Sequence, residues 1–300
     1  MNALPLLDLG MIILIFALIS TGQGTLANVL IVSYLGLTIY KSIPIMEANR
    51  GSRAFNAGDN EKALMHFKKA SEHRFTKPYI RANYGYLLMR AGKLEEAEAI
   101  LTELTQVKTR DDRFKYKNHI NLAILQWKKG DTGAAIAKME EIQDAYKNSL
   151  MYEILGYLYL INGDNEKALE FNHDAHQFNP EDNVISANLA QSYYALGKKE
   201  KAMDLYEEII ETVNFPEAHY YFGKLKWEAG DYITAREAFE KTLIMPSPYL
   251  SSLTEEDYQA NYEAFRAAME AENVDWNALL PEDEEETPQI LNKAKEYKND

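Results

Sequence analysis

The sequence has no cysteine and an excess of negative charge. Without cysteine there is no disulfide framework, no thiolate nucleophile and no cysteine-ligated metal, a composition that suits a reducing compartment. The 32 Lys and Arg residues are outnumbered by 46 Asp and Glu residues, which gives a formal net charge of -14. A protein that binds phosphate backbones needs a basic surface. The composition therefore predicts that nucleic acid is not a partner.

The sequence also lacks the patterns that carry enzyme chemistry. No stretch alternates like a β-strand, and no glycine-rich loop suited to a phosphate is present. His173 and His176 have the one spacing that suggests a metal, but two histidines make an incomplete site. Catalysis needs a converging set of acid, base, nucleophile or metal ligands. We therefore expect no enzyme activity, no cofactor and no metal.

What the sequence does contain is a repeat. A glycine is followed five residues later by an alanine six times, and successive glycines are 34, 38, 33, 34 and 33 residues apart. A period near 34 is typical of helical repeat arrays. We expect each glycine to end one helix in the left-handed conformation and each alanine to leave space for a close helix crossing. The pairs are Gly58/Ala63, Gly92/Ala97, Gly130/Ala135, Gly163/Ala168, Gly197/Ala202 and Gly230/Ala235.

The fourth unit, residues 151–180, carries the most complete pattern, and it resembles the tetratricopeptide repeat. Asn172 stands where that pattern has phenylalanine, whereas the sixth unit has Phe239 there. The resemblance covers residues 44–250 and implies an all-α fold, an α-solenoid of six tetratricopeptide helix pairs. It also implies that the first helices line a concave groove that binds other proteins. The markers of the fourth unit are Tyr152, Leu155, Gly156, Tyr159, Ala168, Ala175 and Pro180.

The residues before the repeats are a different kind of sequence. Two apolar runs, residues 2–20 and 25–41, are separated by a short polar turn, and only two side chains before Glu47 are charged. A cleaved signal peptide is one alternative, but it would have a basic start and no second apolar run. A buried hairpin of soluble helices is another, but neither run has a polar stripe. We predict a transmembrane helical hairpin over residues 1–43, with the lipid bilayer as a partner through residues 4–42.

The residues that follow the second run predict an orientation and a boundary. The turn between the runs has no Lys or Arg, whereas Lys41, Arg50 and Arg53 follow the second run closely. Segments rich in Lys and Arg next to a membrane helix usually stay on the cytoplasmic side. We therefore expect a multi-pass cell-membrane protein with its repeats in the cytoplasm. Proline favours the first turn of a helix. We therefore expect the second membrane helix to end near Ser42 and the first repeat helix to begin at Pro44.

The end of the chain predicts a cap and a tail. Residues 254–272 read as one amphipathic helix with Tyr258 and Phe265 on one face, which is typical of the helix that shields the last repeat. Residues 273–300 are rich in acidic side chains and predict a solvated acidic tail. An interaction motif around Trp276, Leu279 and Leu280 is the alternative.

One position of the first helices indicates binding. It carries asparagine in four of six units, although asparagine is a poor residue inside a helix. The family resemblance implies that this position faces the groove, where an amide can bind the backbone of an extended peptide whatever its side chains. The alternative is that these amides satisfy the backbones of neighbouring helices. The four residues are Asn49, Asn83, Asn121 and Asn188.

Aromatic residues fall on the same expected faces. Exposed Tyr and Trp side chains are good anchors for a partner, because they bury a large area at low entropic cost. For each ring taken alone, packing inside the array is the alternative explanation. The candidates are Tyr86, Trp127, Tyr157, Tyr194, Tyr220 and Trp227.

These features predict a membrane-anchored scaffold or adaptor that binds a protein partner or an extended peptide in its groove, at the cytoplasmic face and without catalysis. One alternative is a structural assembly factor or accessory subunit of a membrane complex. Another is a soluble repeat protein with a buried N-terminal hairpin.

Overall fold

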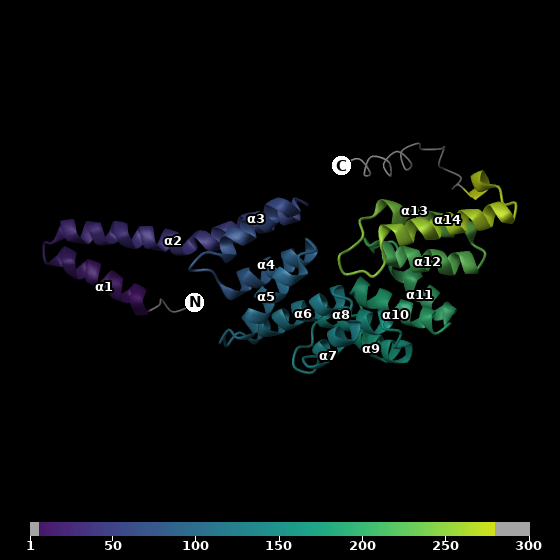
Figure 1. Ribbon diagram of the computed structural model, residues 1–300, viewed down its shortest axis with the longest axis horizontal. Coiled ribbons are helices and arrows are strands. Elements are labelled where there is room, and N and C mark those ends of the chain that lie inside the picture. The colour runs from purple at the N-terminus through teal and green to yellow at the C-terminus, as the bar shows by residue number, and fades with distance from the viewer. Residues whose placement is uncertain (1–5, 280–300) are drawn as a thin grey trace. The chain divides into compact units, whose positions relative to one another are not determined.

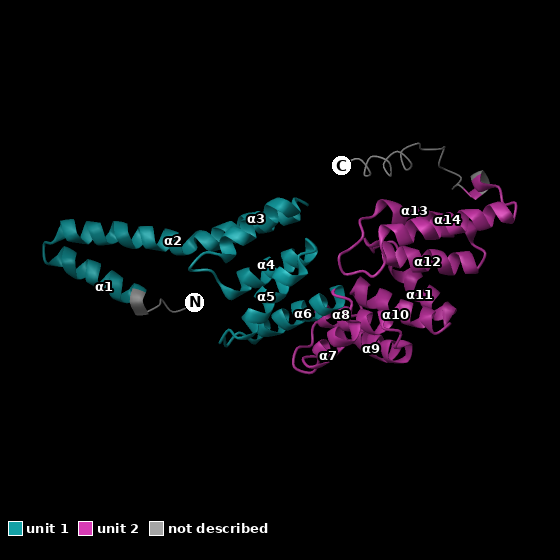
Figure 2. Cartoon of the chain, in the orientation of Figure 1, with its two compact units in different colours: residues 1–128 teal, residues 129–300 magenta. Residues whose placement is uncertain are grey.

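The computed structural model describes residues 6–279, and this range contains no strand. Fourteen α-helices and a final 3-10 helix follow one another along it, so the all-α fold is confirmed (Figure 1). The helices group into two compact units, unit 1 (residues 1–128) and unit 2 (residues 129–300), shown in Figure 2. Each unit has its own packing.

The described part of unit 1 consists of α1 (Leu6–Ser20), α2 (Gly24–Asn56), α3 (Asn60–Ser71), α4 (Pro78–Arg90), α5 (Leu94–Thr105) and α6 (Asp112–Lys128). Helices α1 and α2 form a hairpin, and α2 also packs on α3. Helix α4 packs on α3 and α5, and α6 packs on α4 and α5. The pairs α2/α3 and α4/α5 are therefore complete repeats, and α6 is the first helix of a third.

The described part of unit 2 consists of α7 (Thr132–Glu140), α8 (Ser149–Ile161), α9 (Asn165–Phe178), α10 (Asn183–Ala195), α11 (Lys199–Ile209), α12 (Pro216–Glu228), α13 (Tyr232–Ile244), α14 (Glu255–Ala271) and η1 (Trp276–Leu279). Consecutive helices pack as the pairs α8/α9, α10/α11 and α12/α13, and α14 packs on α13. Helix α14 occupies the stretch expected to form the capping helix, and its Tyr258 and Phe265 are buried.

The turns between paired helices form as the repeat predicts. All six turn glycines have positive φ angles, between 70° and 92°, which end the preceding helix in the left-handed conformation. The six alanines are fully buried where the next helix crosses. In three of the turns an aspartate then caps the following helix by accepting a backbone N–H three residues on. These caps are Asp59, Asp131 and Asp231.

Helix α2 does not end where the sequence predicts. The expected boundary between Ser42 and Pro44 is wrong, because α2 runs unbroken from Gly24 to Asn56 with Pro44 buried inside it. Proline already has a helical φ and removes one backbone hydrogen bond, and the packing on both sides holds the helix across that gap. The apolar run and the first repeat helix are therefore one continuous element.

Within residues 6–279, α2 is the one helix that is long and apolar enough to cross a membrane. Its apolar window has a mean hydropathy of 1.6, and 6% of that window is buried in the rest of the chain. Helix α1 is apolar too, but its 15 residues are fewer than the roughly 20 that span hydrocarbon. Large apolar side chains are open on both helices, with Phe16 73% and Val32 69% exposed.

The last described residues pack on the final helix pair. Leu279 in η1 is buried in a core cluster with Phe265, and Arg236 Nη1 donates to the carbonyl of Trp276 at 2.8 Å. The expected tail over 273–300 is therefore folded at its start, because apolar side chains there complete the core beside α14. The remainder of that stretch lies outside the described residues.

Candidate functional site

Unit 1 presents three of the four predicted asparagines on successive first helices. Asn49 on α2 and Asn83 on α4 are exposed, and Asn121 on α6 is half-buried. Helix α4 contacts both α2 and α6, so the three residues lie on adjacent elements of one unit. None of the three side chains makes a hydrogen bond to another described residue. Their donors and acceptors are therefore available to a partner.

On α4 the asparagine belongs to an open stripe. Tyr79, Asn83, Tyr86 and Arg90 follow one another at spacings of four, three and four residues, which places them on one side of a helix. Three of them are exposed and Tyr86 is half-buried. Leu88, on the other side, is 1% exposed. The stripe therefore offers an amide beside an aromatic ring.

The first helices of unit 1 are basic. The first helices of unit 1, which are residues 44–56 of α2 together with α4 and α6, carry eight Lys and Arg residues and two acidic ones. The second helices, α3 and α5, together carry three Lys and Arg residues and five acidic ones. Residues 1–128 as a whole have 17 Lys and Arg against 11 Asp and Glu, a net +6. Residues 129–300 have 15 against 35, a net -20. Charge of this sign favours an acidic partner for the first helices of unit 1.

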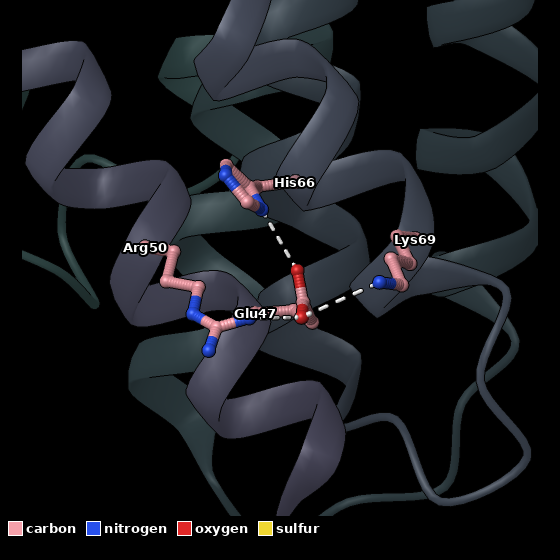
Figure 3. Close-up of polar contacts among 4 residues, drawn as sticks. All are labelled: Glu47, Arg50, His66 and Lys69. Atoms are coloured by element: carbon pink, nitrogen blue, oxygen red, sulfur yellow. Dashed lines mark hydrogen bonds and ion pairs between the residues drawn. The ribbon is translucent and has the colours of Figure 1, made fainter.

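Glu47 fixes α2 against α3. Its side chain is 4% exposed, and its Oε2 lies 2.7 Å from Nδ1 of His66 on α3 (Figure 3). Arg50 donates to Oε1 at 2.8 Å, and Lys69 Nζ lies 3.6 Å from the same oxygen. The His66 hydrogen bond and the two cations hold the pKa of Glu47 below its ordinary value, although burial acts in the opposite sense. Asn49 is two residues further on, about 200° around the helix, and so faces away from α3.

The fourth predicted asparagine is placed differently. Asn188 on α10 is 4% exposed, and its Nδ2 donates to the carbonyl of Glu153 on α8 at 2.9 Å. Asn172 on α9, which stands at the phenylalanine position of the repeat, donates to Oγ of Ser192 on α10 at 2.9 Å. In unit 2 the amides therefore join neighbouring helices, which is the alternative that the sequence leaves open.

The structure separates the predicted aromatic anchors into two groups. Tyr86, Tyr194 and Tyr220 are half-buried. Trp127 is 9% exposed, and Trp227 packs edge-on against Phe265 with ring centroids 5.3 Å apart. Both tryptophans therefore pack within their own units, Trp127 as a buried ring and Trp227 as a half-buried one, and their role as anchors stays a prediction. Tyr157 is 7% exposed and belongs to a buried polar cluster.

That cluster, in unit 2, is not revealed by any sequence pattern. Tyr157 on α8 and Glu217 on α12 meet Ser251 and Ser252, which lie between α13 and α14. Burial raises the pKa of Glu217 to about 7, although hydrogen bonds from Ser251 and Tyr157 act in the opposite sense. Tyr157 and Ser252 are 95 residues apart in the sequence. Only the stacking of successive repeats brings them together.

The paired histidines of α9 gain no further metal ligands from the described part of the fold. His173 Nδ1 lies 3.2 Å from Nε2 of Gln177 on the same helix. Among residues 6–279, no group of three or more His, Cys, Asp or Glu side chains is placed to hold a metal ion.

Three family models, each described as tetratricopeptide repeat, match residues 54–118, 120–183 and 188–213. The chain belongs to the tetratricopeptide repeat family. Together the matches cover about half of the chain, and they fall on the helix pairs of both units. The family resemblance of the sequence is confirmed, and the fold indicates a protein-interaction scaffold.

Named relatives and solved structures are similar in fold. The sequence is 25% identical over 187 residues to a TPR repeat-containing protein of Methanocaldococcus jannaschii, covering 59% of this chain and 33% of that protein. The chain spans about a third of the length of the curated relatives it matches. A monomeric IFIT1 mutant solved with Gppp-AAAA has a TM-score of 0.59 at 18% identity, covering 95% of this chain and 67% of that one. The APC/C hetero-tetramer Cut9–Hcn1 has a TM-score of 0.59 at 13% identity, and the match covers 74% of this chain and 42% of that one. At these identities, the likeness to both structures concerns the fold alone.

Proposed function

We propose that this tetratricopeptide protein is a non-catalytic scaffold, anchored in a membrane by α1 and α2, whose unit 1 binds an extended acidic peptide of a partner protein. One observation carries the proposal. Asn49, Asn83 and Asn121 have unbonded amides, whereas Asn188 is bonded to its neighbouring helix. Asn188 is also 4% exposed, so a peptide cannot reach its amide. Peptide binding through the asparagine position therefore belongs to unit 1.

The chemistry of this face suits an extended backbone. Each asparagine amide pairs with one C=O and one N–H of the peptide, and each such hydrogen bond contributes on the order of 0.5–1.5 kcal/mol. Tyr86 adds an apolar contact beside Asn83. The exposed side chains of Arg53 and Lys117 favour acidic residues in the peptide. The formal net charge of -14 on the whole chain disfavours a polyphosphate partner, which supports a protein partner over nucleic acid.

A cluster near the end of the apolar part of α2 supports the membrane anchor. The ring of Tyr40 lies 4.8 Å from that of His73 and 5.8 Å from that of Phe75, and Lys41 Nζ lies 5.8 Å from the Phe75 ring. Tyrosine and lysine at the end of an apolar helix are the groups that anchor at a membrane interface. The first repeat then lies at the membrane surface, α1 is the second, shorter span, and the basic flank keeps the repeats in the cytoplasm.

A second function is favoured by the exposed apolar side chains of the hairpin. Phe16 and Val32 are open on α1 and α2, and such side chains can pack on the membrane helices of another protein. In this case the scaffold is an assembly factor or accessory subunit of a membrane complex, and unit 1 holds a soluble segment of the same complex.

The amide proposal is tested by replacing Asn49, Asn83 and Asn121 together by alanine in the full chain in detergent. The probe is a fluorescent ten-residue Glu-Thr repeat peptide, followed by fluorescence anisotropy. We expect the wild type to bind it and the triple variant to lose at least about 100-fold in affinity, because three pairs of backbone hydrogen bonds are lost. The melting temperature should stay unchanged, since these amides have no partner within residues 6–279.

Asn188→Ala is the matched control. It should lower the melting temperature, because it removes the hydrogen bond that joins α10 to the Glu153 carbonyl on α8, and it should leave peptide affinity unchanged. A Lys-Thr repeat peptide and an oligonucleotide of the same length should not bind the wild type. Unchanged affinity of the triple variant, or a fall in its melting temperature like that of Asn188→Ala, would contradict the proposal.

A further inference from the structure

The connection between α13 and α14 is unusually long, and it contacts helices other than the two that it joins. It has ten residues, against four to eight in the other five connections that follow a second helix of a repeat. Figure 1 shows it looping away from α13 before it returns to α14. A connection that only joined two packed helices would need fewer residues. The extra length therefore serves a contact elsewhere in unit 2.

That contact is made with α8. The backbone N–H of Ser252 donates to Oη of Tyr157 at 2.7 Å, and the Oγ of Ser252 lies 2.8 Å from the same Oη. A main-chain donor and the neighbouring hydroxyl thus meet one side chain on a first helix. Main-chain and small polar side-chain hydrogen bonds of this kind are contacts that an extended peptide can make with a protein surface.

The same segment also contacts α12. Ser251 Oγ donates to Oε2 of Glu217 at 2.7 Å, and the Tyr157 hydroxyl donates to the same oxygen at 3.2 Å. Tyr157, Glu217 and Ser251 are 7%, 8% and 8% exposed, whereas Ser252 is exposed, so the Glu217 side of the cluster is buried and the Ser252 side is open to water. Helix α10, which packs on α8, reaches α12 through the hydrogen bond of Gln191 to Tyr221. The segment therefore bridges the first helices of the fourth and sixth repeats.

We infer that residues 246–253 are an internal ligand of unit 2, which occupy in cis a peptide-binding face formed by α8 and α12. The ligand class of this face is an extended peptide with two adjacent serines, one bonded through its side chain to Glu217 and one through its backbone to Tyr157. Partner peptides of this class bind unit 2 only when the segment is displaced. This face lies in unit 2, and so it stands apart from the peptide binding proposed for unit 1.

Tethering explains why the face stays occupied. A segment joined at both ends has an effective concentration on the order of millimolar, so a free peptide at micromolar concentration does not displace it. Replacing residues 246–253 by an alternating Gly-Ala linker of equal length removes the side-chain bonds of Ser251 and Ser252 and so weakens this competition. The linker is still long enough to join α13 to α14, but it has no hydroxyl group to contact Glu217 or Tyr157.

The test uses the full chain in detergent and a fluorescent synthetic peptide of residues 245–254. We expect the linker variant to bind this peptide at least 10-fold more tightly than the wild type does. Adding Tyr157→Phe to the linker variant should abolish the gain, and a peptide with alanine in place of Ser251 and Ser252 should not bind. Equal binding to the wild type and to a folded linker variant overturns the inference.

A second measurement keeps the test decisive if the linker variant does not fold. Hydrogen exchange of the Ser252 amide should be slow in the wild type, because it donates to Tyr157, and should speed up 10-fold or more in Tyr157→Phe. Amides in the middle of α12 should exchange at the same rate in both. Exchange of the wild-type Ser252 amide at the rate of an unstructured peptide overturns the inference by itself. Neither readout involves Asn49, Asn83 or Asn121, so the two proposals fail independently.

Discussion

At the scale of single residues, the neighbour of a polar group decides whether it holds the protein together or stays open to a partner. Asn172 replaces a phenylalanine of the repeat and is fully buried, and the residue that faces it on α8 is Gly156. A Cβ at Gly156 would collide with the Asn172 amide, so the glycine makes room for it. That amide in turn bonds Ser192 on α10. Asn83 has no such neighbour and keeps its amide exposed.

Glu217→Gln should make unit 2 more stable at pH 8. Because burial raises the folded-state pKa of Glu217 to about 7, above its ordinary value of 4.5, folding favours the protonated carboxyl. The ionised form is therefore penalised, and stability falls as the pH rises from about 4.5 to about 7, with the full loss present above 7. That loss is at most on the order of 3 kcal/mol. Glutamine stays neutral and still accepts from Ser251.

The melting temperature of the full chain in detergent, followed by circular dichroism at pH 5 and at pH 8, checks this. The variant should lose less stability than the wild type between these values. Glu153, whose pKa is also raised to about 7 by burial and by Asp182, is present in both proteins and leaves a residual pH dependence in each. A pH dependence identical in the two proteins would count against a buried ionisable Glu217.

At the scale of elements, α2 joins two environments in one helix. Its first part is apolar and exposed, and its last part packs on α3, where Glu47 meets His66, Arg50 and Lys69 (Figure 3). The apolar part and the first helix of the first repeat therefore form one continuous helix. The buried carboxylate of Glu47, with its partners Arg50, His66 and Lys69, is one of the contacts that hold α2 against α3.

Glu47→Gln should loosen α3 from α2. The change removes the carboxylate that three cationic or hydrogen-bonding side chains share, so amide exchange in α3 should become several-fold faster at neutral pH. Because the folded pKa of Glu47 is lowered, its stabilising effect is present above its ordinary pKa and is lost as the pH falls through the lowered value. The difference between the proteins should therefore shrink in acid. Glu61→Gln, at an exposed position of α3, is the control and should have little effect.

At the scale of the whole chain, apolar and charged surface are segregated along the sequence. The hairpin exposes large apolar side chains, residues 1–128 carry a net +6, and residues 129–300 carry a net -20. An apolar hairpin followed by a basic repeat unit suits a membrane with anionic headgroups.

Val32→Lys should weaken membrane association of the full chain. Val32 is 69% exposed and lies near the middle of the apolar part of α2, where a lysine costs roughly 2.5–3.5 kcal/mol of insertion. Met65→Lys, at a position on α3 that is 57% exposed, places the same charge outside the hairpin and should change nothing. The fraction that resists alkaline carbonate extraction measures both. Equal extraction of the two variants would mean that the hairpin packs on protein rather than on lipid.

The fold was largely predictable because its rules are local. Turn glycines, crossing alanines and helix periodicity each act within one repeat, and the structure confirms them at every repeat. The end of α2 was not predictable from Pro44, because the packing of α2 on α3 and on α1 outweighs the single hydrogen bond that proline removes. The fate of the four asparagines was not predictable either. Their local sequence contexts do not show which amide meets a carbonyl on another helix.

The sequence by itself determined the repeat, the family, the apolar N-terminal hairpin and the absence of a thiol, since these depend on composition and on spacing within about forty residues. Only the tertiary structure decided which polar groups are used internally. The Asn188 side chain on α10 donates to a carbonyl on α8, and the Ser252 backbone N–H donates to Tyr157, 95 residues away in the sequence. These donors are therefore used within the protein. The physical reason is that a hydrogen bond depends on the distance between two atoms in space, and stacking of the repeats sets that distance.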